Sequence, residues 1–124
     1  MKQRVPSRAW YSPGRPGRRP RVLVEDAHPA LAISDFSRFE QAGFDVAHCS
    51  GPAVAGRDCP VLRGQRCALL GGADVVLHGL DPRLGIAAAI RRSHPGLPVI
   101  EQPGDCSVAG QITALRRALA PPGR

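Results

Sequence analysis

Short apolar runs alternate with helix-like segments along most of this chain, and this alternation constrains the fold more than any other feature. The runs cover residues 21–24, 44–48, 73–77 and 97–100, and apolar residues recur at helical spacing between them and again over 108–119. Strands and helices that alternate in this way form right-handed βαβ units, in which a parallel sheet is covered on both faces. The pattern therefore predicts one small α/β domain with three layers and about four parallel strands.

Prolines and polar residues mark where the predicted helices begin. Pro29 suits the first turn of a helix, and Asp81 followed by Pro82 is typical of an N-cap and the helical position after it. The stretch 49–72 holds three cysteines, five glycines and two prolines. We expect this stretch to be an irregular loop, with one short helix near 61–70.

The excess positive charge lies in one segment. The formal net charge is +7, but residues 1–21 contain seven Lys or Arg and no Asp or Glu, so the remainder of the chain is neutral. Prolines and glycines within this segment oppose both helices and strand pairing. We therefore expect 1–20 to be a disordered basic arm, 21–120 to form the α/β domain, and 121–124 to be a short tail.

The basic arm is a candidate for binding nucleic acid. Lysines and arginines neutralise phosphates irrespective of base sequence, and Trp10 and Tyr11 are placed to stack on bases. The alternative, which composition favours, is a leader without a binding role. The candidate nucleic-acid residues are Arg4, Arg8, Arg15, Arg18 and Arg19.

The chain carries no pattern typical of secretion or membrane insertion. Its basic first segment lacks the apolar core of a signal peptide, and no stretch approaches the roughly 18 apolar residues that span a bilayer. We expect a soluble, cytoplasmic protein that does not bind a membrane. In that compartment its four cysteines would remain mainly as thiols.

Four stretches, in order along the chain, resemble those of response-regulator receiver domains. Residues 22–26 resemble the first strand with its acidic pair, and 40–46 resemble the passage into the second strand. Residues 73–82 and 95–100 are similar to the third-strand and fourth-strand regions. The resemblance covers about residues 21–102 and implies a flavodoxin-like or receiver-like sheet with strand order 2-1-3-4.

The resemblance fails at the residues that carry out phosphotransfer. Glu25 and Asp26 match the acidic pair that binds metal in the family, but His78 stands at the position of the phospho-acceptor aspartate. Pro103 stands where the family has a threonine or serine, and the fifth strand with its lysine is missing. The nearest other carboxylate, Asp81, is expected to cap a helix. Because aspartyl phosphorylation needs a carboxylate nucleophile and groups that hold the phosphoryl oxygens, we expect a non-catalytic domain.

A receiver-like scaffold without its reaction centre is expected to act through protein contacts. With no fifth strand, the fourth strand would form an exposed edge of the sheet, which must be covered or paired. The sequence therefore predicts a partner protein or a homodimer.

The predicted strand order also places a candidate binding crevice. In an open α/β sheet, ligands bind beyond the carboxyl ends of the strands where the strand order reverses, here between the first and third strands. Glu25, Asp26 and His78 would line this crevice, with His28 nearby. Two carboxylates and an imidazole can hold a divalent metal. The alternative, which we favour, is that these groups are polar loop ends that face water or cap helices.

Three cysteines within nineteen residues form a second candidate site. Cys49, Cys59 and Cys67 lack the C-x-x-C spacing typical of zinc and iron–sulfur sites, but they can still group with His48. Cys106 should lie about 14 Å away, because the second and fourth strands are three positions apart at roughly 4.8 Å per strand. Ordinary thiols without a cofactor, a structural zinc or iron–sulfur site, and redox sensing all remain open.

Overall fold

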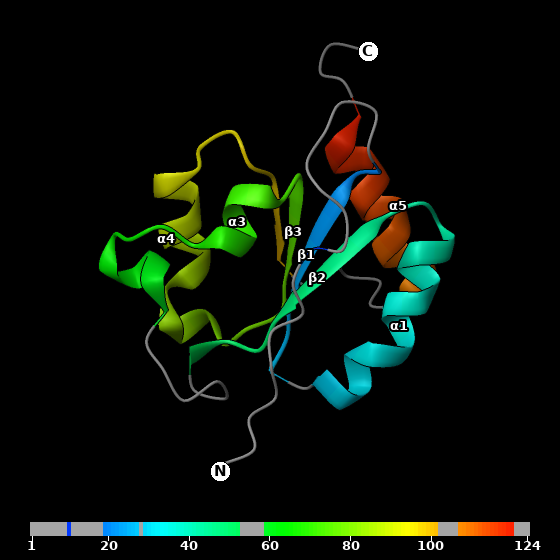
Figure 1. Ribbon diagram of the computed structural model, residues 1–124, viewed down its shortest axis with the longest axis horizontal. Coiled ribbons are helices and arrows are strands. Elements are labelled where there is room, and N and C mark those ends of the chain that lie inside the picture. The colour runs from blue at the N-terminus through cyan, green and yellow to red at the C-terminus, as the bar shows by residue number, and fades with distance from the viewer. Residues whose placement is uncertain (1–9, 11–18, 28, 53–58, 102–106, 121–124) are drawn as a thin grey trace.

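Four parallel strands form the centre of the molecule, as Figure 1 shows for the computed structural model. The structure describes residues 10, 19–27, 29–52, 59–101 and 107–120. The strands are β1 (Arg21–Glu25), β2 (Asp45–Cys49), β3 (Val75–His78) and β4 (Val99–Glu101). They pair in the order β2-β1-β3-β4. The predicted parallel sheet of order 2-1-3-4 is therefore confirmed.

Helices cover both faces of this sheet and complete the three predicted layers. The α-helices are α1 (Pro29–Gln41), α3 (Ala68–Gly72), α4 (Ile86–Ser93) and α5 (Val108–Leu119). Two 3₁₀ helices, η1 (Pro60–Arg63) and η2 (Pro82–Leu84), lie in the connections. In Figure 1, α1 and α5 lie on one side of the strands, and α3 and α4 lie on the other.

Strand alternation divides the hydrophobic core into two clusters. Along β1, Val22 and Val24 face the α1 and α5 side, where Phe39 is buried with them, because successive side chains of a strand point to opposite faces. Leu23 faces the other side and packs with Ile90 of α4. Each fully buried side chain of this size stabilises the fold by about 1.5–3 kcal/mol, so both faces hold the helices in place.

The predicted cap before α4 serves a different helix. The Asp81 carboxylate accepts a hydrogen bond of 2.9 Å from the Arg83 backbone N–H, which caps η2 and not α4. Gly85 then adopts a left-handed backbone with φ of 73°, and α4 begins at Ile86. A left-handed residue cannot continue a helix, so the single helix expected from the sequence is divided in two. The stretch 49–72, expected to hold one short helix, contains both η1 and α3.

Trp10 packs on the domain, which corrects the expectation for this residue of the arm. Its indole Nε1 donates a hydrogen bond of 3.2 Å to the Leu69 carbonyl, and the Arg21 guanidinium lies 5.2 Å from the ring centroid. Gly72 leaves room for the ring, because a Cβ there would lie 2.6 Å from Nε1. A half-buried indole held in this way is not available to stack on bases.

Two further residues of the predicted arm contact the domain. The Pro20 carbonyl accepts a hydrogen bond of 2.8 Å from the Asp45 backbone N–H, and the Arg19 guanidinium donates to the Glu40 carbonyl. Of the other nucleic-acid candidates, Arg4, Arg8, Arg15 and Arg18 lie outside the described residues, as does the tail 121–124. Among the helices that the structure describes, none is long and apolar enough to cross a membrane.

Candidate functional site

The carboxyl ends of β1 and β3 bring Glu25 and His78 together, as the strand order predicts. The two residues are partners in the register, and His78 Nδ1 lies 2.6 Å from Glu25 Oε1. Both residues are 4 % exposed, and the Gly79 backbone N–H donates to the Glu25 carbonyl at 2.7 Å. This short contact gives each of the two buried groups a hydrogen-bond partner, which offsets the cost of removing both from water.

The second ring nitrogen of His78 has no such partner. Nε2 is buried and forms no hydrogen bond with any residue that the structure describes. A buried donor or acceptor without a partner costs about 1–3 kcal/mol, which the fold must offset elsewhere. One hydrogen-bonding atom of the Glu25–His78 pair is therefore unused.

A small cavity lies beside this pair, between the strand ends and the helices α1 and α5. Its volume is about 40 Å³, and Asp26, Asp35 and Gln111 contribute to its wall together with Glu25 and His78. This volume is enough for bound water. Within the described ranges no three His, Cys, Asp or Glu side chains are arranged to hold a metal ion, so the divalent metal considered for the crevice stays the less favoured alternative. His28 lies outside the described residues.

The nearest carboxylate after β3 belongs to Asp81, which is exposed and bound to Arg83. The Arg83 guanidinium donates to the carboxylate at 2.9 Å in addition to the backbone bond. These hydrogen bonds hold the pKa of Asp81 below its ordinary value. The Asp81 side chain is thus occupied as a helix cap, as the sequence predicts for it.

His48 does not join the cysteines, which corrects the predicted grouping. Its Nε2 lies 3.0 Å from the Asp26 carbonyl oxygen, and its ring lies 5.4 Å from that of Phe36 on α1. Burial lowers the pKa of His48 below its ordinary value of 6.5, against a weaker opposing effect of Asp26. Cys49, the next residue of β2, faces the opposite side of the sheet because strand side chains alternate.

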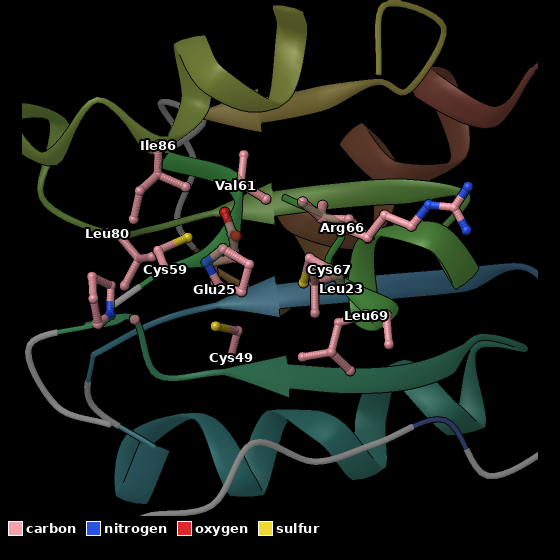
Figure 2. A pocket seen from close by; sticks show the side chains of 15 residues that line it. Leu23, Glu25, Cys49, Cys59, Val61, Arg66, Cys67, Leu69, Leu80 and Ile86 are labelled. Carbon is pink, nitrogen blue, oxygen red and sulfur yellow. The ribbon is translucent and has the colours of Figure 1, made fainter. Parts of the chain in front are cut away.

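The three described cysteines line one larger cavity on the α3 and α4 side of the sheet (Figure 2). The cavity has a volume of about 290 Å³, and none of the three cysteines forms a disulfide. Cys49 ends β2, while Cys59 and Cys67 immediately precede η1 and α3. The sequence offered a grouping of these three as one alternative, and it did not indicate the cavity that they line. Cys106 lies outside the described residues.

The rest of the large cavity is mostly apolar, and Glu25 lies at its floor. The apolar wall includes Leu23, Val61, Leu69, Leu80 and Ile86. In Figure 2 the Glu25 carboxylate points into the space, whereas the Arg66 guanidinium points away from it. Glu25 also lines the small cavity, so this one residue borders both spaces.

A closely approaching loop shapes one end of the large cavity. Gly51 has a φ of 86°, and a Cβ at this position would lie 2.9 Å from Leu80 Cδ2. Both residues line the cavity. The glycine thus allows the chain after β2 to lie against the chain after β3. The sequence showed only that a glycine follows the second predicted strand, and this did not indicate its close contact with Leu80.

Sheet order, helix placement and the position of the crevice together define a receiver-like fold. The solved structure of a response regulator receiver domain protein from Clostridium thermocellum is similar, with a TM-score of 0.56 and 15 % sequence identity. The match covers 81 % of this chain and 94 % of that one. No protein-family model and no curated protein matches the chain. This likeness confirms the predicted fold, and the function must be argued from the residues.

Proposed function

We propose that this chain is a regulatory domain that acts through protein contacts, without aspartyl phosphorylation and without catalysis. The observation that carries the proposal is the end of β3, where His78 is buried and hydrogen-bonded to Glu25. A receiver domain needs a carboxylate nucleophile at this place. Here an imidazole takes the place of that nucleophile and binds one of the carboxylates that would otherwise serve a metal.

The neighbouring residues support the same proposal. Gly79, which follows His78, has no side chain, and the next carboxylate, Asp81, is exposed and bound to Arg83. Beyond β4, the residues that the structure describes form only α5. A fifth strand carrying a lysine is therefore not among them. Phosphoryl transfer depends on groups that position and neutralise the phosphoryl oxygens, and these described residues supply few of them.

The edge of the sheet supports a role in protein contacts. Within the described residues β4 is an outer strand, and its Val99 and Ile100 are only half-buried. An edge strand presents unpaired backbone groups, which a partner protein or a second copy of the chain can cover. We propose a cytoplasmic partner or a homodimer.

Exposure to a small phosphodonor tests the proposal directly. The protein is incubated with acetyl phosphate and Mg²⁺, and in parallel with beryllofluoride, and is followed by intact mass and by amide chemical shifts. We expect neither a phospho-adduct nor a shift localised at the ends of β1 and β3. The Asp81→Asn variant is the matched control, because it removes the nearest carboxylate without changing the proposed outcome. A stable adduct on Asp26 or Asp81 contradicts the proposal.

The three thiols on one cavity support a second candidate, a cysteine-based redox or metal sensor, although no three His, Cys, Asp or Glu side chains of the described residues are arranged to hold a metal ion. Cys49, Cys59 and Cys67 line the same cavity, and the thiolate is both the metal-binding and the redox-active form of cysteine. Metal analysis of protein purified under reducing conditions separates the two candidates. Stoichiometric zinc or iron, lost in each of the three Cys→Ser variants, would favour the sensor over the contact domain.

A further inference from the structure

We propose that the large cavity is a binding site for a small organic amine, with the ammonium group on the Glu25 carboxylate and an apolar body against η1 and α3. The inference concerns the cavity alone. It holds whether or not the chain accepts a phosphoryl group.

The size and walls of the cavity fit a small organic molecule. Its volume of about 290 Å³ lies near the lower end of the range for ligand sites, roughly 300–1,000 Å³. Its wall is mostly apolar, with Val61 and Leu80 buried and Leu69 half-buried. Apolar walls with a few placed polar groups are the usual composition of such sites. Water filling this space would leave much of the wall in contact with solvent, at a cost in free energy.

The charge inside the cavity selects the ligand's polar group. Glu25 is 4 % exposed, and its carboxylate points into the space (Figure 2). A carboxylate has about four acceptor positions, and in the described structure the Glu25 side chain receives one hydrogen bond, from His78. An ammonium group supplies both the missing donors and the opposite charge, in a hydrogen bond of the strong, charge-assisted kind.

The other charged residue of the wall does not change this assignment. Arg66 is exposed, and in Figure 2 its guanidinium points away from Glu25. An anionic ligand would therefore meet a buried carboxylate of the same sign, and no described residue of the wall directs a cation toward that carboxylate. A metal ion is also disfavoured, because the described residues provide no group of three metal-binding side chains. An amine is the class that both the apolar wall and the carboxylate accommodate.

Three probes with one apolar body and different charge test the proposal. Phenethylamine, 2-phenylethanol and phenylacetate are titrated into the full chain at neutral pH and followed by amide chemical shifts. We expect the amine to bind about tenfold more tightly than the alcohol, and phenylacetate to bind most weakly, since hydrogen bonds between charged groups are about twice as strong as neutral ones. An equal or reversed order for the amine and phenylacetate overturns the proposal.

Substitution of the carboxylate assigns the effect to Glu25. In Glu25→Gln the affinities for amine and alcohol should fall within about threefold of each other, because the charge is removed and the shape is kept. Glu101→Gln is the matched control, because Glu101 is exposed on β4 and paired with Arg91, and it should keep the wild-type order. A folded Glu25→Gln protein that keeps the preference for the amine refutes the assignment.

The thiols provide a readout that needs no variant. Bound phenethylamine should slow the alkylation of Cys49, Cys59 and Cys67 by iodoacetamide several-fold, as measured by peptide mass spectrometry on the wild-type chain. This measurement decides the question if Glu25→Gln does not fold.

A bulky residue in the wall gives a further test. Cys67→Trp, which replaces a half-buried wall residue with a bulky one, should abolish binding of the amine. Absence of protection at amine concentrations that saturate any observed shifts, or binding that persists in a folded Cys67→Trp protein, overturns the proposal.

Discussion

The buried charged residues at the two ends of the sheet have different surroundings. At the amino end, Arg21 has its Nε 3.6 Å from Asp45 Oδ2, its backbone N–H donates to Asp74 at 2.8 Å, and its guanidinium lies beside the Trp10 ring. At the carboxyl end, Glu25 and His78 bind each other between two cavities. Both ends bury charge, and at the carboxyl end two cavities lie beside it.

The two ends differ in what surrounds their buried polar groups. At the amino end, opposite charges and an aromatic ring surround Arg21, which offsets the cost of removing it from water. Three buried side-chain atoms form no hydrogen bond within the described residues: His78 Nε2 and Ser50 Oγ at the carboxyl end, and Arg21 Nε at the amino end, which lies in the ion pair with Asp45. Groups that the fold leaves unsatisfied are the ones available to a ligand or to water. Because cavities border Glu25 and His78, the carboxyl end is where we propose recognition, and we expect the amino end to contribute mainly to stability.

Removal of Arg21 should give the largest loss of stability. Arg21→Ala removes a buried guanidinium whose Nε lies 3.6 Å from the buried Asp45 carboxylate, and breaking a buried ion pair costs about 3–5 kcal/mol. The free energy of unfolding is measured by denaturant titration. Arg83→Ala removes a shorter ion pair, 2.9 Å from Asp81, that is exposed to solvent, and it should cost far less because water screens the attraction. Equal losses for the two variants would show that the amino end is not specially stabilised by its charges.

Trp10→Ala should destabilise the domain by about 2 kcal/mol, because it removes a half-buried aromatic surface, a hydrogen bond and a cation–π contact. A truncation of 1–18 should cause a similar loss, contrary to what the composition of the arm suggests. Leu62→Ala is the control, since Leu62 is 43 % exposed and should have little effect. A melting temperature unchanged by both Trp10→Ala and the truncation would show that the ring does not hold the amino end.

A glycine substitution probes the packing of the carboxyl end. Gly51→Ala should cost about 1–2 kcal/mol, because an L-residue is strained at a φ of 86° and its Cβ would press on Leu80. Gly96→Ala is the control, because a Cβ there meets nothing within 4 Å and the backbone is not left-handed. The two variants are compared by thermal unfolding. A loss at Gly96 as large as that at Gly51 would be at odds with this account of the loop.

The smallest expected effect is a pH dependence from His48. Burial places its pKa in the folded protein below the ordinary value of 6.5, so the unfolded chain binds the proton more readily. The contribution to stability is complete above about pH 6.5 and is lost as the pH falls toward the folded pKa. His48→Gln, which does not titrate, should show a shallower decline in the free energy of unfolding over this window. Parallel pH profiles for the two proteins would rule out a role for His48 burial.

The strand order and the meeting of Glu25 with His78 could be predicted, because local patterns determine them. Apolar runs locate β1 and β3, and the parallel order then places their last residues side by side. The grouping of Cys49, Cys59 and Cys67 was one alternative among several, because residues 49–72 lacked a pattern that fixes their fold. In contrast, His48 was misplaced, because strand alternation sends adjacent residues to opposite faces.

The contacts of Trp10 and the cavity itself could not be predicted in this way. Trp10 binds the carbonyl of Leu69, which is 59 residues away, and no local pattern encodes such a pairing. The cavity depends on how far η1 and α3 lie from β1, which is a property of packing volumes and not of periodicity. Likewise, the sequence does not distinguish Gly85 from the other glycines of the chain, although its left-handed backbone separates η2 from α4.

The three thiols around the large cavity make its wall sensitive to oxidation during preparation and storage. Cys49, Cys59 and Cys67 are each partly exposed, so peroxide or dissolved oxygen can reach them. Oxidation to a sulfenic or sulfinic acid would add polar oxygen atoms, and in the second case a negative charge, to an otherwise apolar wall. Two preparations with the same sequence and the same fold could then differ in what this space accepts. The time that the protein spends in contact with air should therefore be controlled in any binding experiment on this cavity.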